Sequence, residues 1–142
     1  MLFWLLLKVM AVRTGPLSYY HPGDGNCGKT TACGKRFTFA QEHIALRDWY
    51  RLGCGRKVYV CAHATRRCAT TRVGDGGPYV VYPQALSYRQ ALKRRRFKVW
   101  VKTRPPRGWR FREVADLSHG LWLKLGKPRY RSNITIVVLP RH

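Results

Sequence analysis

The stretch that decides the fold of this chain reads GDGGPY over Gly74–Tyr79, and a second stretch, ADLSHGLWLKLG, follows over Ala115–Gly126. The first stretch places Asp75 in a turn, because glycine and proline adopt turn conformations readily. The second stretch places Asp116 at the start of an amphipathic helix, where an aspartate is a good N-cap. These two aspartates are therefore the first residues to consider for either a structural or a chemical role.

The helix expected after Asp116 has one apolar stripe. Leu117, Leu121 and Leu125 lie four residues apart, which predicts that they face the core. Trp122 lies off this stripe, so we expect it at the surface, where its ring can stack on a ligand.

The rest of the chain predicts many short strands and little helix. Arg56–Ala62 and Ala69–Val73 are rich in β-branched and aromatic residues, as strands are. Ile134–Leu139 is a continuous apolar run, which predicts a strand buried on both faces. Gln41–Leu46 is expected to form a short helix or turn. A length of 142 residues suits one domain, and the many short strands predict a small closed barrel of the mainly β class.

The two aspartate motifs resemble the D-x-G-P-[FY] and D-L-S-x-x-x-x-x-L-G framework of rare lipoprotein A domains, which are related to expansins, barwin and barrel-type endoglucanases. Ser18–Tyr20 is similar to the entry strand of that family, and the resemblance covers residues 18–81 and 112–139. It implies a six-stranded double-psi β-barrel with short helices over residues 18–142, with a basic insertion at 83–111. It also implies that the domain binds or cleaves cell-wall polysaccharide.

The resemblance further implies the residues of a lytic transglycosylase, which cleaves the peptidoglycan glycan to a 1,6-anhydro product. The family aspartate maps to Asp75 and the family histidine maps to His43. Asp116 is a third catalytic candidate, because barrel-type endoglucanases use the aspartate of the D-L-S motif; its alternative role is the N-cap. Lys35 stands where the family has a glutamate, and a lysine is a poor proton donor to the leaving oxygen at neutral pH. We therefore expect glycan binding with weak or no cleavage.

Four aromatic residues are candidates for binding the sugar rings of the glycan, because an aromatic face stacks on an apolar face of another ring. They are Tyr20, Trp49, Tyr79 and Trp122. Burial in the core is the alternative role of each ring.

The composition is strongly basic. The chain has 28 Lys and Arg against 6 Asp and Glu, a net charge of +22, which requires an anionic partner or a strongly solvated face. The cations concentrate in the insertion at 83–111, where aromatic residues are interleaved with them. A solvated loop is one interpretation; the favoured one is a docking arm for a polyanion or a neighbouring protein, with the candidates Arg94, Arg95, Arg96, Trp100 and Trp109.

All five cysteines lie between positions 27 and 68, at Cys27, Cys33, Cys54, Cys61 and Cys68. Clustered cysteines in a small domain favour disulfides and an oxidising compartment, with one thiol left over. The alternative is that all five are reduced and buried. No C-x-x-C pair is present, so neither a metal nor a cofactor is expected. A phosphate-loop pattern over Gly23–Thr30 is treated as a chance match, because it lacks the flanking strand and helix.

Residues 1–17 are expected to lie outside the barrel as an apolar segment. Their apolar run is too short to span a bilayer, and two interpretations are equally open: the h-region of a secretion signal, or a docking arm.

Two functions follow from these patterns. The favoured one is binding of peptidoglycan or another cell-wall polysaccharide, with or without lytic transglycosylase activity. The alternative is a docking module of a larger assembly such as a bacteriophage tail tip, held by protein partners through the N-terminal segment and the insertion, with catalysis lost. Nucleic-acid binding is the least favoured. The expected location is extracytoplasmic (secreted or in the cell envelope) or in a virion.

Overall fold

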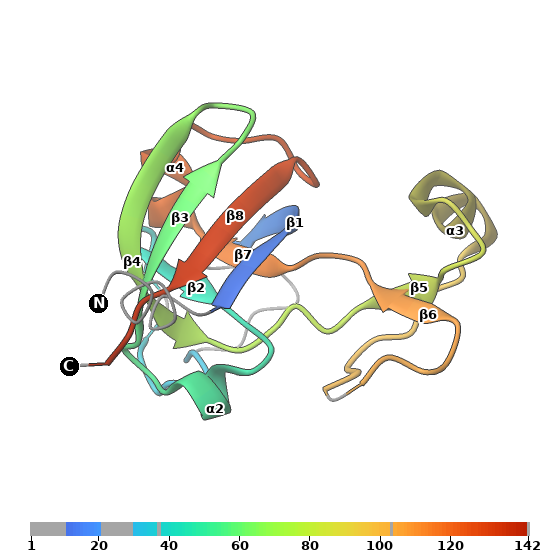
Figure 1. Cartoon of the computed structure of the whole chain (residues 1–142), viewed down its shortest axis with the longest axis horizontal. Helices are drawn as coiled ribbons and strands as arrows, with labels where there is room; N and C mark the ends of the chain where they lie inside the picture. The colour runs from blue at the N-terminus through green and yellow to red at the C-terminus, as the bar shows by residue number, and fades with distance from the viewer. Residues whose placement is uncertain (1–10, 21–29, 37, 103, 142) are drawn as a thin grey trace, which may run out of the picture.

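The main body of the chain is a closed six-stranded β-barrel (Figure 1). The computed structural model describes residues 11–20, 30–36, 38–102 and 104–141. The strand order around the barrel is β1-β7-β2-β4-β3-β8. These strands are β1 (Ala11–Tyr20), β2 (His43–Ala45), β3 (Lys57–Ala62), β4 (Arg67–Asp75), β7 (Ala115–Ser118) and β8 (Asn133–Val138). The described helices are short: α2 (Trp49–Leu52), α3 (Tyr88–Arg94) and α4 (His119–Lys124).

The first strand closes the barrel by pairing with two partners. Residues 11–16 of β1 pair antiparallel with β8, and residues 17–20 pair in parallel with β7. The change of partner falls at Pro16, whose nitrogen has no hydrogen to donate, while its carbonyl accepts from Val114 N at 2.8 Å. The short strand β2 lies between β4, with which it is parallel, and β7, with which it is antiparallel. Closure of this kind leaves the six strands without a free edge.

The core lies inside the barrel and is built by alternate residues of each strand. Leu17, Ile44, Val58, Leu117 and Ile136 are all 0% exposed. The alternation is clearest in β8, where Ile134, Ile136 and Val138 are buried and the residues between them are not. The expectation that this strand is buried on both faces is therefore wrong, because only one face of a barrel strand points inward.

Three expected elements differ from those observed. The first strand begins at Ala11, so it includes the last residues of the segment expected to lie outside the barrel. Residues 43–45 form strand β2 rather than a helix or turn, because they pair with two neighbouring strands.

The third difference concerns Asp116, which is not a helix N-cap. Asp116 lies within strand β7, and Ser118 caps α4 by accepting from Leu121 N at 3.4 Å. Leu117, Leu121 and Leu125 are buried as expected, but Leu117 reaches the core from the strand.

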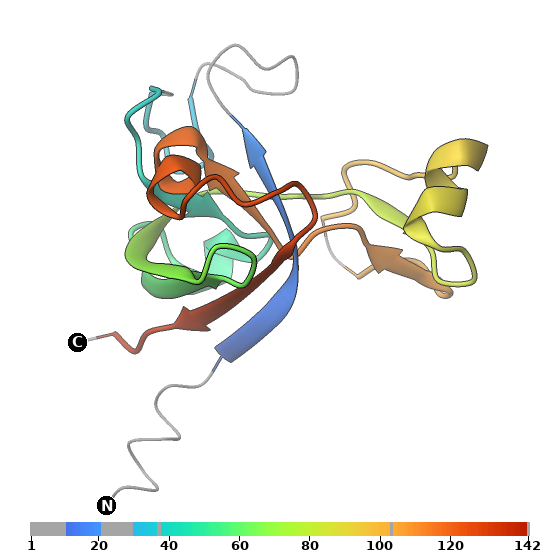
Figure 2. The same cartoon turned by 90° about the horizontal axis from the view of Figure 1, so that it is seen from above.

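The segment between β4 and β7 projects to one side of the barrel (Figure 2). It contains a two-stranded sheet of β5 (Val81–Pro83) and β6 (Trp109–Phe111), together with α3. Tyr82, Tyr88 and Phe97 form its aromatic centre, with ring centroids 6.2–6.3 Å apart. Arg131, from the connection before β8, places its guanidinium 3.8 Å from the Tyr88 ring and so joins the insertion to the barrel. Lys98 adds a single antiparallel bridge to Val81 of β5.

Four of the five cysteines form disulfides, Cys33–Cys54 and Cys61–Cys68. Cys27 lies outside the described residues. The second bond joins register partners on β3 and β4, and the first joins two loops. Because disulfides persist in oxidising compartments, the pair indicates an extracytoplasmic environment. None of the helices among the described residues has the length and apolarity needed to cross a bilayer.

An ion pair between the barrel and the loop before α2 should make stability depend on pH in the acid range. Arg13 donates two hydrogen bonds to Asp48, at 2.6 and 2.7 Å. Burial alone would raise the pKa of Asp48, but Arg13 outweighs it and lowers the pKa from 3.8 to about 2. As the pH falls, the unfolded chain therefore binds a proton at Asp48 before the folded chain does. The contribution of this ion pair to the free energy of unfolding is present above pH 4 and is lost as the pH falls towards 2. We expect the free energy of unfolding, measured with urea between pH 5 and 2, to change less with pH for Asp48→Asn than for the wild type. An equal change with pH in both proteins would contradict this assignment.

The insertion should be separable from the barrel. Pro83 and Trp109 are register partners in the β5–β6 pair, so a two-residue Asn-Gly turn can join them. We expect a variant with residues 84–108 replaced by Asn-Gly to keep a cooperative thermal transition and a dispersed NMR spectrum, because the six barrel strands are unchanged. An unfolded variant would show that the barrel depends on the insertion.

Candidate functional site

Three side chains that point away from the barrel core meet at one end, and two of them, Tyr20 and His43, are themselves buried, each at 7% exposure. They are Tyr20 from β1, His43 from β2 and Asp75 from β4. Tyr20 Oη shares a short hydrogen bond with His43 Nε2 and donates to Asp75 Oδ2 at 3.4 Å. The structure thus brings together two of the three residues predicted to be catalytic and one predicted to bind substrate.

A register shift in the β2–β4 pair positions this cluster. Ile44 is paired with Val73, whereas the next residue, Ala45, is paired with Asp75, so Gly74 is left out of the register. A Cβ on Gly74 would lie 2.7 Å from His43 Cγ. Only glycine therefore permits the imidazole to pack against β4 at this point. The sequence indicated Gly74 only as part of a turn, whereas the structure shows that its missing side chain makes room for His43.

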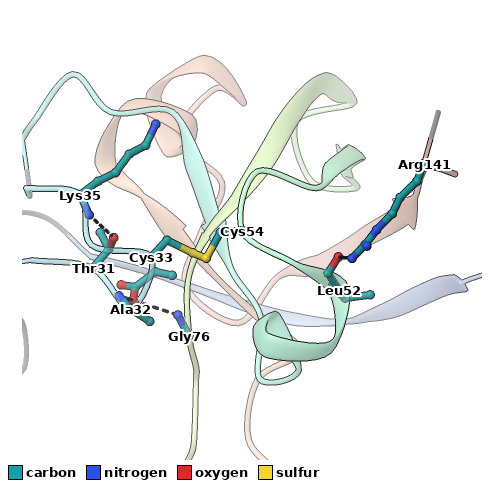
Figure 3. The surroundings of a disulfide bond; sticks show 9 residues. Thr31, Ala32, Cys33, Lys35, Leu52, Cys54, Gly76 and Arg141 are labelled. Carbon is teal, nitrogen blue, oxygen red and sulfur yellow. Dashed lines mark hydrogen bonds between the residues drawn. A yellow bond between two sulfur atoms is a disulfide. The ribbon is translucent and has the colours of Figure 1, made fainter.

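The carboxylate of Asp75 is held by backbone donors. Its Oδ1 accepts from Ala32 N at 2.7 Å and from Gly76 N at 2.8 Å. Ala32 precedes Cys33, and the Cys33–Cys54 disulfide ties this loop to the turn before β3 (Figure 3). The disulfide therefore helps to hold the backbone N–H of Ala32 in hydrogen-bonding position at the carboxylate of Asp75.

His43 is mostly buried, at 7% exposure, and its backbone N donates to Ser118 Oγ at 2.9 Å. Burial lowers its pKa below the usual 6.5, the charge of Asp75 opposes this, and the charge of Lys35 lowers it further. The imidazole is consequently neutral at neutral pH and can accept or share a proton. A cavity of about 310 Å³ beside it is lined by Lys35, Glu42 and His43, so the lysine at the family glutamate position does face the predicted site.

Asp116 lies on the same outer face but outside the hydrogen-bonded cluster. In the register, Ala45 is paired with Asp116 on one side and with Asp75 on the other. Two strand spacings place the two aspartate Cα atoms about 10 Å apart. Asp116 accepts from Ser18 Oγ at 2.9 Å. It lines a second cavity, of about 330 Å³, which also has Gly76 in its wall.

Two of the predicted sugar-binding rings lie at this second cavity or beside it. Tyr79 lines the cavity with Trp100, and their ring centroids are 5.7 Å apart. Burial raises the pKa of Tyr79, and a hydrogen bond with Trp49 opposes that rise. A Cβ on Gly76 would lie 2.6 Å from both Trp49 Nε1 and Tyr79 Oη, so this glycine allows the two rings to meet. Trp49 packs against the core.

The fourth predicted ring, Trp122, belongs to a row of aromatic side chains that sequence reasoning missed. Trp122 stacks on Tyr19 with centroids 4.6 Å apart, and His119 lies 5.5 Å away. Phe39 meets His119 at 5.7 Å and is 58% exposed. The spacing of three residues between His119 and Trp122 on a helix was the available signal. Tyr19 and Phe39 come from distant segments of the chain, so no spacing in the sequence indicated that they join this row.

The predicted docking residues lie in three places. Trp100, at 66% exposure, lies at the cavity beside Asp116. Trp109 lies on β6, where Lys98 Nζ is 4.6 Å from its ring centroid. Arg94, Arg95 and Arg96 are exposed at the end of α3.

Chemically, the site offers a neutral imidazole, a phenol and a carboxylate in one hydrogen-bonded cluster, with a second carboxylate on the neighbouring strand pair. Such a set can transfer a proton to or from a hydroxyl or a glycosidic oxygen. Within residues 11–20, 30–36, 38–102 and 104–141, no three His, Cys, Asp or Glu side chains form a group that could hold a metal ion. Comparison with known proteins finds no matching family model and no matching curated sequence.

The titration of His43 tests this arrangement of charges. Because Lys35 lowers the pKa of His43 and Asp75 raises it, Lys35→Gln should raise the imidazole pKa and Asp75→Asn should lower it. We expect the wild-type midpoint below 6.5, measured from the His43 ring signals by NMR. Lys57→Gln, which removes an equal charge from β3, is the matched control and should leave the midpoint unchanged. A wild-type midpoint at or above 6.5 would contradict the burial of this ring.

Proposed function

We propose that the barrel is a double-psi β-barrel of the rare lipoprotein A kind. Two features support this proposal. The closed barrel contains two parallel pairs, β1–β7 and β2–β4, among otherwise antiparallel pairs. The residues that match the family motif also lie together on the outer face of those four strands.

We further propose that this face binds bacterial cell-wall glycan. The observation that carries the proposal is the combination of two cavities with exposed aromatic rings in the wall of one of them. Gly74 lines one cavity and Gly76 lines the other, and each cavity has acidic or imidazole groups in its wall. Saccharides are recognised through the same two contacts, because their hydroxyls hydrogen-bond to carboxylates and their apolar ring faces stack on aromatic rings. The oxidising environment indicated by the disulfides suits a secreted, envelope or virion protein.

Cleavage of the glycan is expected to be weak or absent. A lytic transglycosylase protonates the glycosidic oxygen as the bond to C1 breaks, while the 6-hydroxyl bonds to C1 and gives up its proton to a base. Asp75, hydrogen-bonded to Tyr20, is the candidate for exchanging these protons. Lys35 lines the cavity at the position where the family has its glutamate, so the carboxylic acid that would protonate the leaving oxygen is missing there.

The alternative function is a docking module in a larger assembly. The insertion favours it, because Leu92, Val99 and Trp100 are 55%, 62% and 66% exposed. Apolar side chains at that exposure on a projecting segment suit a protein interface.

Binding to purified peptidoglycan sacculi tests the main proposal. We expect the wild type to co-sediment with sacculi and Phe39→Ala to weaken binding about two- to tenfold, because one aromatic stacking contact is lost. Tyr59→Ala is the matched control: this ring is also exposed, at 42%, but lies on β3, away from the site. If neither variant nor wild type binds sacculi, the glycan proposal is wrong and the docking alternative is favoured.

The release of anhydro-muropeptides, measured by mass spectrometry, tests the catalytic part. We expect little or no release by the wild type, more by Lys35→Glu, and none when Asp75→Asn is added to Lys35→Glu. The amide keeps the shape of the side chain but cannot exchange the proton. Release that is unaffected by Asp75→Asn would remove this residue from the mechanism.

A further inference from the structure

A strongly cationic cavity lies where the insertion meets the barrel. Its volume is about 640 Å³, larger than either cavity of the glycan face. Arg13 comes from β1, Arg51 from α2, and Arg47 from the loop between β2 and α2; Lys102 and Arg104 come from the insertion. Five cations therefore surround this space.

One carboxylate, Asp48, lines the same cavity, and it is already paired with two of these cations. Asp48 accepts both hydrogen bonds from Arg13 and a third from Arg51 at 2.9 Å. A carboxylate with three charged donors has little capacity left for further cations. The cavity therefore keeps a surplus of positive charge, contributed mainly by Arg47, Lys102 and Arg104.

Arg47 is fixed in place without an acidic partner. Its guanidinium carbon lies 3.6 Å from the centroid of the Phe111 ring, and Nη1 donates to the carbonyls of Pro78 and Glu113 at 3.2 and 2.6 Å. In the part of the chain that the structure describes, no carboxylate forms a salt bridge with it. Burial lowers the pKa of Arg47 to about 10; the charge of Arg13 adds to this effect, and the charges of Asp48 and Glu113 oppose it. The charge of Arg47 is therefore not neutralised by a salt bridge among the described residues, and Arg47 lines the cavity, where it can contact an anion.

We propose that this cavity binds the phosphodiester groups of an anionic polymer of the bacterial envelope. Cationic side chains from four separate parts of the chain line one space. Several cationic donors around one space suit a tetrahedral anion with several acceptor oxygens better than a planar carboxylate. The choice of an envelope polymer over nucleic acid rests on the proposed function and on the oxidising environment that the disulfides indicate; the phosphate site itself rests on neither.

The test measures binding of a glycerol-phosphate oligomer and of inorganic phosphate to the full chain by calorimetry. Lys102→Gln with Arg104→Gln removes two exposed cations from the cavity and should not affect folding. Arg47→Gln removes the fixed cation, with its fold checked by circular dichroism. The matched control is Arg66→Gln with Arg129→Gln, which removes two exposed cations elsewhere. We expect each cavity variant to weaken oligomer binding about tenfold or more, because each loses a hydrogen bond to a charged group, and the control to change it less than twofold.

Four outcomes would overturn the proposal in distinguishable ways. Equal weakening by the cavity pair and the control pair would show that net charge alone attracts the oligomer. Tighter binding of a DNA oligonucleotide with the same number of phosphates would favour nucleic acid as the ligand. Binding of inorganic phosphate without the oligomer would exclude a polymer, and no binding of either would exclude the phosphate site. Sacculi stripped of phosphate polymers separate the two proposals: if the wild type fails to bind them but binds the oligomer through the cavity, the glycan proposal fails and the phosphate site stands.

Discussion

The pairing of one strand with two partners is the constraint on which the rest of the structure depends. β1 is bonded to β8 along its first part and to β7 along its second part. Strands β7 and β8, which come from the second half of the chain, are thereby both bonded to β1. Tyr20 lies at the end of β1 and Arg13 near its beginning, so the same strand contributes to the hydrogen-bonded cluster and to the cationic cavity. Both sites exist only when the barrel is closed.

The sequence predicted the parts of the fold that local patterns control. Strands β3, β4 and β8 were predicted from their β-branched and aromatic residues, and disulfides were favoured because the cysteines are clustered, although their pairing was not predicted. Strand β2 was not readable, because its three residues carry no period of their own and become a strand through pairing on both sides. Asp116 was misplaced for a related reason. Its motif satisfies the rules for a helix start, but pairing with β1 and β2 extends the strand as far as Ser118, which caps the helix instead.

The candidate site was predictable as a set of residues but not as an arrangement. Asp75 and His43 were found from a motif, and their contact through Tyr20 depends on a register shift that no local pattern indicates. The role of Gly74 also depends on that shift, because the clash it avoids is with a residue on another strand. The cationic cavity escaped prediction altogether. Its arginines are scattered along a chain in which basic residues are common, so only the folded chain shows which of them face each other.

The insertion shows how a chain with few acids accommodates many cations. Aromatic rings take the place of carboxylates: guanidinium or ammonium groups lie over Tyr82, Trp109 and Phe111, among others. Such contacts are strongest where the cation is partly desolvated. The segments that lead into and out of residues 84–108 lie side by side, because Pro83 and Trp109 are paired in the two-stranded sheet. For protein engineering, this makes the junction a place where segments of other lengths can be inserted while the six barrel strands keep their pairing.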